Sequence, residues 1–111
     1  YENGAAAARE LLGRTVPVDG LLAMTSIVAG GGMEVFRGQG RSVPEDISII
    51  VFDDSEIMNM AVPRLTSVQL HLRRMGVEAV RSLNRLIAGE EVGDTMLDVS
   101  LKLGESTRSR A

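Results

Sequence analysis

The sequence predicts an α/β fold in which a mainly parallel sheet is flanked by helices, as in a Rossmann-like lobe. Two observations support this class. Short apolar runs bounded by turn residues have the length of buried strands. They alternate with longer segments in which apolar residues recur every three or four positions, as on one face of a helix. Alternation of this kind is typical of parallel sheets. At 111 residues the chain has the size of one domain.

The first elements follow from composition. Residues 4–12 are rich in alanine and leucine and predict a helix that Gly13 ends. Residues 19–24, DGLLAM, form a short apolar run of the kind found in buried strands.

A second helix and a second strand are expected next. Residues 27–37 predict a helix that Thr25 or Ser26 caps. Its three consecutive glycines, 30–32, oppose that prediction by up to about 1 kcal/mol each relative to alanine. Residues 47–52, ISIIVF, are uncharged and β-branched, which favours a buried strand.

The second half predicts two further strands around one helix. Residues 65–70 read as a strand, and the apolar spacing of residues 72–88 predicts an amphipathic helix that Gly89 ends. Residues 95–103 alternate polar and apolar side chains, as in a half-exposed strand near a sheet edge. The expected order is therefore α-β-α-β-β-α-β.

Composition excludes several classes of function. The formal net charge of −3 gives no basic face for direct binding of nucleic acid. No apolar run approaches the roughly 20 residues of a membrane span. The chain has no cysteine, which fits a cytoplasmic protein and excludes thiolate chemistry. His71, the single histidine, has no partner at metal-ligand spacing, so neither a metal nor a cofactor is expected, and an exposed histidine at the start of a helix is the simpler interpretation.

Polar residues follow two of the expected strands. Thr25 and Ser26 follow the first, and Asp53 and Asp54 follow the second. Ligands of open α/β sheets bind at the carboxyl ends of the strands, which makes both pairs candidates. A turn cap beside a solvated carboxylate explains Asp53 and Asp54 about equally well. An acid–base pair is disfavoured, because adjacent residues at a strand end point in different directions.

Three motifs carry a resemblance to a known family. They are RSVPEDISIIVFDD (residues 41–54), PRLTSV (63–68) and the MG…L…LIAGE helix (75–90). The chain resembles, from Gly4 to Thr107, the C-terminal part of the effector domain of LacI/GalR-family bacterial transcriptional regulators. That domain has two lobes, is similar to periplasmic sugar-binding proteins, and holds a small ligand between its lobes.

The resemblance implies an arrangement of the chain. Residues 1–64 would belong to one lobe, residues 65–90 would cross into the other lobe, and residues 95–107 would form the return strand. We expect a piece of a longer cytoplasmic protein that is not an enzyme, whose DNA-binding headpiece is not in this sequence. Operator DNA would be bound only through that missing headpiece. The alternative is a fragment of a periplasmic-type sugar-binding protein.

The resemblance also implies site residues. Asp53 matches a cleft position that accepts hydrogen bonds from sugar-like effectors, and Thr25 and Ser26 stand where the family usually has Asn-Asp. Leu70 and Val51 replace a common glutamine and a frequent glycine. These departures, with Thr25 and Ser26, leave two alternatives: an effector less polar than a hexose, or a site that has lost effector binding. Membership of a homodimer is implied as well. The expected subunit interface comprises Ile27, Gly31, Val35, Met58 and Met60. Met58 could instead fold back onto its own core.

Overall fold

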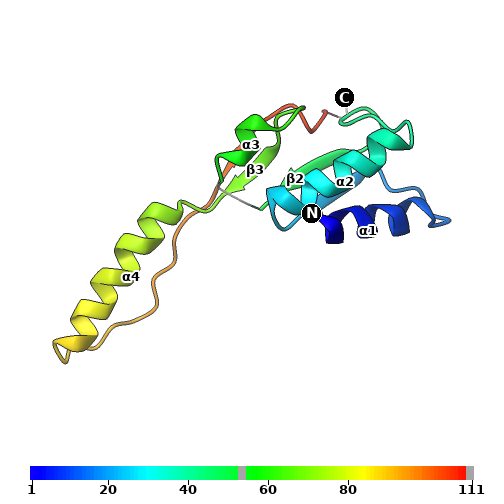
Figure 1. Cartoon of the computed structure of the whole chain (residues 1–111). Helices are drawn as coiled ribbons and strands as arrows, with labels where there is room; N and C mark the ends of the chain where they lie inside the picture. Colours follow the sequence, from blue (N-terminus) through cyan, green and yellow to red (C-terminus); the bar gives the residue numbers. More distant parts are fainter. Residues whose placement is uncertain (53–54, 110–111) are drawn as a thin grey trace.

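The structure is a computed structural model of the chain. It describes residues 1–52 and 55–109, and for residues 57 and 58 it describes the backbone alone. Figure 1 shows the elements in sequence colours. In chain order they are α1 (Glu2–Leu12), β1 (Gly20–Ala23), α2 (Ser26–Gly38), β2 (Ser48–Val51), α3 (Ile57–Met60), β3 (Thr66–Gln69), α4 (Leu72–Ile87) and β4 (Ser100–Lys102).

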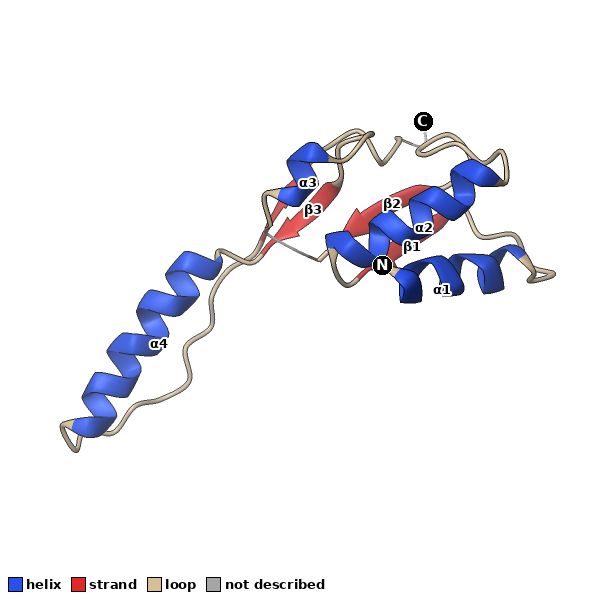
Figure 2. Ribbon diagram, in the orientation of Figure 1, coloured by secondary structure: helices blue, strands red, loops and turns tan. Residues whose placement is uncertain are grey.

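The strands form one sheet in the order β1-β2-β3-β4 (Figure 2). β1, β2 and β3 are parallel, with Ala23 opposite Val51 in β1 and β2. β4 pairs antiparallel with β3 and closes one edge of the sheet. The expected mainly parallel α/β class is confirmed, and so is the position of the last strand at an edge.

Two expectations were wrong in detail. The strand expected over residues 95–103 is confined to Ser100–Lys102. Residues 95–97 run beside α4 instead, where residues of both segments line a hollow of about 380 Å³. Alternating polarity is compatible with a strand, but a strand forms only where a neighbouring strand is present to pair with it. The second error concerns the loop expected after residue 54, which contains the four-residue helix α3, too short to show a helical period.

The core lies between the sheet and the pair of helices α1 and α2, which pack along one another (Figure 1). Its centre is Phe36 of α2 against Ile49 and Val51 of β2, all with at most 1% of their surface exposed. The remaining members of the core are aliphatic or methionine: Ala8, Ala23, Ala29, Met33, Ile47 and Leu65. A core with one aromatic side chain agrees with the aromatic content of only 3%.

Glycine permits the close approach of α1 to α2. A Cβ atom at Gly4 would lie 2.0 Å from the backbone oxygen of Val28, and one at Gly31 would lie 1.9 Å from that of Tyr1. The triple glycine therefore forms a helix despite its poor propensity, because tertiary packing of α2 outweighs the intrinsic cost. The close contact that it allows is made within the chain.

α4 extends away from the rest of the molecule (Figure 1). The molecule as a whole, α4 included, measures 58 Å along its longest axis. None of the α4 residues is buried. Its exposed apolar side chains are Leu72, Met75, Val77, Val80, Leu83, Leu86 and Ile87. An amphipathic helix with an uncovered apolar stripe is built to pack on another element. Across the described residues, none of the helices combines the length and apolar character needed to cross a membrane.

Candidate functional site

The carboxyl ends of β1, β2 and β3 meet at one edge of the sheet, because the three strands are parallel. The chain continues from β1 into Met24, from β2 into Phe52 and from β3 into Leu70. We call this edge the carboxyl edge. It is the place where open α/β sheets bind ligands.

Thr25 is the N-cap of α2. Its backbone is extended, at φ −143° and ψ 159°, and its Oγ1 accepts a hydrogen bond from the Val28 amide at 3.3 Å. This satisfies one of the amide groups that a helix start leaves without an intrahelical partner. Thr25 thus has a structural task at the carboxyl edge, while its side chain remains exposed.

Ser26 connects two loops of the edge. It is 4% exposed, and its Oγ lies 3.0 Å from Oγ of Ser55. Ser55 comes from the segment after β2, so the hydrogen bond holds that segment against the first turn of α2. Ser26, which follows β1, and Ser55, which follows β2, are therefore brought together. Each hydroxyl can both donate and accept a hydrogen bond, as ligand hydroxyl groups require.

Asp53 and Asp54 lie outside the described residues. Phe52 and Ser55, which flank them, both lie at the carboxyl edge. The amide of Phe52 donates to the Ala23 carbonyl at 2.9 Å, which extends the pairing of β1 and β2 by one residue. The assignment of Asp53 as an acceptor for ligand stays a prediction.

Three residues of the edge escaped the sequence analysis. Met24 and Phe52 are 66% and 37% exposed, although each directly follows a strand that ends in a buried residue. Ser55 makes the hydrogen bond to Ser26. Their position one to four residues after a buried strand was the available signal, but both apolar residues read as the ends of apolar runs.

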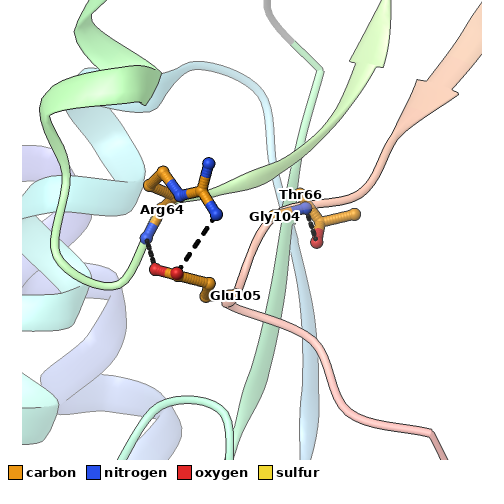
Figure 3. A network of polar contacts seen from close by, with 4 residues as sticks. All are labelled: Arg64, Thr66, Gly104 and Glu105. Carbon is orange, nitrogen blue, oxygen red and sulfur yellow. Dashed lines mark hydrogen bonds and ion pairs between the residues drawn. The ribbon is translucent and has the colours of Figure 1, made fainter.

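The return segment is fixed to the sheet by the contacts shown in Figure 3. Glu105 accepts hydrogen bonds from the backbone amide and from Nη2 of Arg64, both at 3.2 Å. Gly104 donates its amide to Thr66 Oγ1 at 3.0 Å. A Cβ atom at Gly104 would lie 2.5 Å from the Arg64 carbonyl oxygen, so this approach requires glycine.

Ser106 completes that attachment in the interior. Its side chain is fully buried, accepts from the Thr66 amide at 2.8 Å and donates to the Ile49 carbonyl at 2.5 Å. The Ile49 amide in turn donates to the Ser106 carbonyl at 2.8 Å. Residues 104–106 thus join β2 and β3, at the end of the sheet opposite the carboxyl edge.

The expected interface residues differ in how exposed they are. Ile27 is exposed on the first turn of α2, and Met60, at the end of α3, is 80% exposed. Val35 is half-buried. Gly31 is buried under the start of α1, and the close approach that it allows in this structure is to the chain's own helix. Its expected role in a subunit interface stays a prediction. The side chain of Met58 lies outside the described residues.

His71 is exposed and precedes α4, as expected. Within the described part of the chain, no three histidine, cysteine, aspartate or glutamate side chains are grouped so that they could hold a metal ion.

The fold is an α/β unit with polar side chains at the carboxyl edge of its sheet, where open α/β sheets bind ligands. The profile of the periplasmic binding protein-like domain matches residues 1–107. The chain therefore belongs to this family, and its relatives are LacI-type transcriptional regulators.

Three comparisons illustrate this. The transcriptional regulator CelR of Thermobifida fusca is 38% identical over 96% of this chain and 32% of its own length. The structure of a CelR–cellobiose complex is 37% identical, with a TM-score of 0.87 over 96% of this chain and 33% of that chain. The lac repressor dimer bound to operator is 28% identical, with a TM-score of 0.88 over 96% of this chain and 37% of that chain. The chain thus spans about a third of the curated relatives that it matches.

Proposed function

We propose that this chain is the effector-binding and dimerising portion of a LacI-type transcriptional regulator, and that it binds a sugar-like molecule. One observation carries the proposal: hydroxyl groups from the start of α2 and from the segment after β2, Ser26 and Ser55, meet at the carboxyl edge of the sheet, with Thr25 beside them. The CelR relative, whose structure contains cellobiose, supports a sugar as the class of effector.

The division into lobes belongs to this proposal. Residues 1–64 form the body of one lobe, residues 65–90 cross into the other, and residues 95–107 return. Supporting this division, α4 has no buried residue and carries an uncovered apolar stripe, whereas residues 104–106 are held in the sheet. The second lobe would cover the stripe.

Each side chain of the edge has a role in the proposed site. Asp53 is an acceptor for ligand hydroxyl groups, since an ionised carboxylate can only accept. Phe52 and Met24 offer apolar surface to the face of a sugar ring, and Thr25 and Ser26 supply neutral hydroxyls where an amide and a charge are more usual. Closure of the lobes on the ligand shifts the population of dimers that can bind DNA.

The partners follow from the same proposal. The protein is a cytoplasmic homodimer, contacts operator DNA through a headpiece outside this sequence, and is not an enzyme. The Ser26–Ser55 hydrogen bond holds the segment leading to α3 beside the first turn of α2. The exposed Ile27 and Met60 form the core of the proposed subunit interface, together with Gly31, Val35 and Met58. A periplasmic solute-binding role is less favoured, because the similar proteins are transcriptional regulators.

Calorimetry on the full-length protein tests the site, with cellobiose as the first sugar and a panel of mono- and disaccharides after it. Asp53→Ala should weaken binding by roughly 10- to 100-fold, the size of one lost charged hydrogen bond, with the fold intact. Glu45→Gln, an exposed carboxylate in the loop before β2, should leave binding unchanged. Operator binding, followed by fluorescence anisotropy, should respond to the same sugar. If no sugar bound, or if Asp53→Ala bound as tightly as the unmodified protein, this assignment would fail.

A further inference from the structure

The two connections between the sheet and α4 run side by side. β3 leads out to α4 through Leu70 and His71, and the chain returns through Val99 into β4. Gln69 of β3 is opposite Ser100 of β4, the last pair of the antiparallel ladder. Beyond that pair lie only α4 and the segment that returns from it (Figure 1). We call residues 70–71 and 99–100 the neck.

The backbone at His71 is unusual. Its φ of 54° and ψ of 54° place it in the left-handed region, and no other non-glycine residue of the described chain has a positive φ. Residues other than glycine rarely adopt this backbone conformation, and it persists where the surrounding structure holds it. The last residue before α4 is therefore held in a turn that local propensity does not favour.

The side chain of His71 ties the two connections together. Its Nε2 lies 3.1 Å from Oγ of Ser100, which is 29 residues further along the chain. Both side chains are exposed, and neither residue belongs to the core. The hydrogen bond therefore joins the two connections of the neck and is not part of the packing of the core.

We propose that the His71–Ser100 hydrogen bond is a latch that fixes the angle between the two lobes. The inference rests on the two-lobed arrangement proposed above. Any change in that angle must be absorbed by the dihedrals of the neck, because the strands on one side and α4 on the other are regular. While the latch is closed, both connections turn as one unit. His71 acts through the neck, so it is a positioning residue.

The distance between spin labels on the two sides of the neck tests the latch in the full-length protein. Glu45→Cys and Asn84→Cys provide exposed label sites on the loop before β2 and on α4, and cysteines elsewhere in the protein are replaced. Without any sugar, the latched protein should give one narrow distance distribution. Ser100→Ala should add a second distance, with a shift of roughly fivefold in the ratio of the two populations, as expected for one lost neutral hydrogen bond.

Three further variants and one control separate the hydrogen bond from the backbone turn. His71→Gly tolerates the left-handed conformation but lacks the imidazole, so it should resemble Ser100→Ala. Ser100→Thr keeps the hydroxyl, and His71→Asn keeps both a tolerance for the left-handed region and a side-chain donor. Both should restore the narrow distribution. Ser82→Ala, the matched removal of a serine hydroxyl from α4, should leave it unchanged.

The proposal is overturned if Ser100→Ala and His71→Gly give the distribution of the unmodified protein, or if Ser82→Ala broadens it equally. It is also overturned if Ser100→Ala lowers only the Tm, since a merely structural bond would do that without changing the distance. These measurements need no effector. Absence of sugar binding would therefore refute the proposed site and leave the result on the latch standing.

Discussion

The Glu105 carboxylate accepts two hydrogen bonds from Arg64, and they favour its charged form. The hydrogen bond from the Arg64 amide is the larger cause, and the one from the guanidinium is the second. Together they hold the pKa of Glu105 below its usual range. A carboxyl group with a lowered pKa in the folded protein stabilises the fold above the pKa that it has when unfolded. That contribution is lost as the pH falls through the folded value.

Glu105→Gln should therefore lower stability at neutral pH and reduce the loss of stability in acid. The difference between the two proteins should shrink below about pH 4, where a glutamate of ordinary pKa becomes protonated in the unfolded chain. It should disappear once the pH is below the lower pKa of Glu105 in the folded protein. The effect is small, because both partners are exposed and the pair is screened by solvent. Urea unfolding midpoints at pH 7 and at acid pH measure it, with Glu91→Gln as the control on an exposed glutamate. Parallel pH profiles for Glu105→Gln and the unmodified protein would contradict it.

At the scale of helices and strands, regular patterns made most of the fold predictable. The three parallel strands lie within one residue of the predicted bounds at each end, and α1, α2 and α4 within two. Each of these elements carries its own signal in apolar spacing. β4 did not, since residues 95–99 have the polarity of a strand but no neighbouring strand among the described residues.

The candidate site was less predictable than the fold. Thr25 and Ser26 were found because they follow a buried strand, and the cap on α2 was anticipated as one of two alternatives. Ser55 was not found from the sequence, because its role depends on a hydrogen bond to a residue 29 positions away. The resemblance to a family pointed to Gly31 as an interface residue. Only the packing of α1 revealed what that glycine accommodates.

The contact between α1 and α2 makes a sharp prediction at Gly4. Alanine is the better helix former by about 1 kcal/mol, so Gly4→Ala would stabilise an isolated helix. Here its Cβ would lie 2.0 Å from a backbone oxygen, which no side-chain rotation can relieve. The overlap should dominate and cost about 1–3 kcal/mol net.

Gly38→Ala is the matched control, because a Cβ atom there meets nothing within 4 Å. It should be neutral or stabilise the protein by up to about 1 kcal/mol. Thermal unfolding followed by circular dichroism compares the two variants. Equal stabilisation by both would mean that α1 does not pack on α2 in this way.

At the scale of the whole molecule, the proposed homodimer depends on exposed apolar residues of neighbouring elements. Met60→Glu in the full-length protein would bury a charge without a partner in that contact. The dimer dissociation constant should rise by roughly tenfold or more, which corresponds to about 1.4 kcal/mol. Val16→Glu, an exposed apolar residue in the loop between α1 and β1, should leave it unchanged.

Light scattering over a dilution series measures both variants. A dimer that persists in Met60→Glu down to the same concentration as the unmodified protein would remove α3 from the interface. If Val16→Glu dissociated it equally, the effect would be one of net charge and not of contact.

The buried Ser106 also bears on the order in which the protein is made. Ile49 and Thr66, the partners of its side chain, leave the ribosome 57 and 40 residues earlier. Until residues 104–106 follow, the hydrogen bonds of Ser106 with the Thr66 amide and with the Ile49 amide and carbonyl cannot form. The sheet is thus completed only after α4 has been synthesised. A nascent chain halted between α4 and residue 104 would expose an unfinished sheet, which makes that interval the one in which chaperones have most to protect.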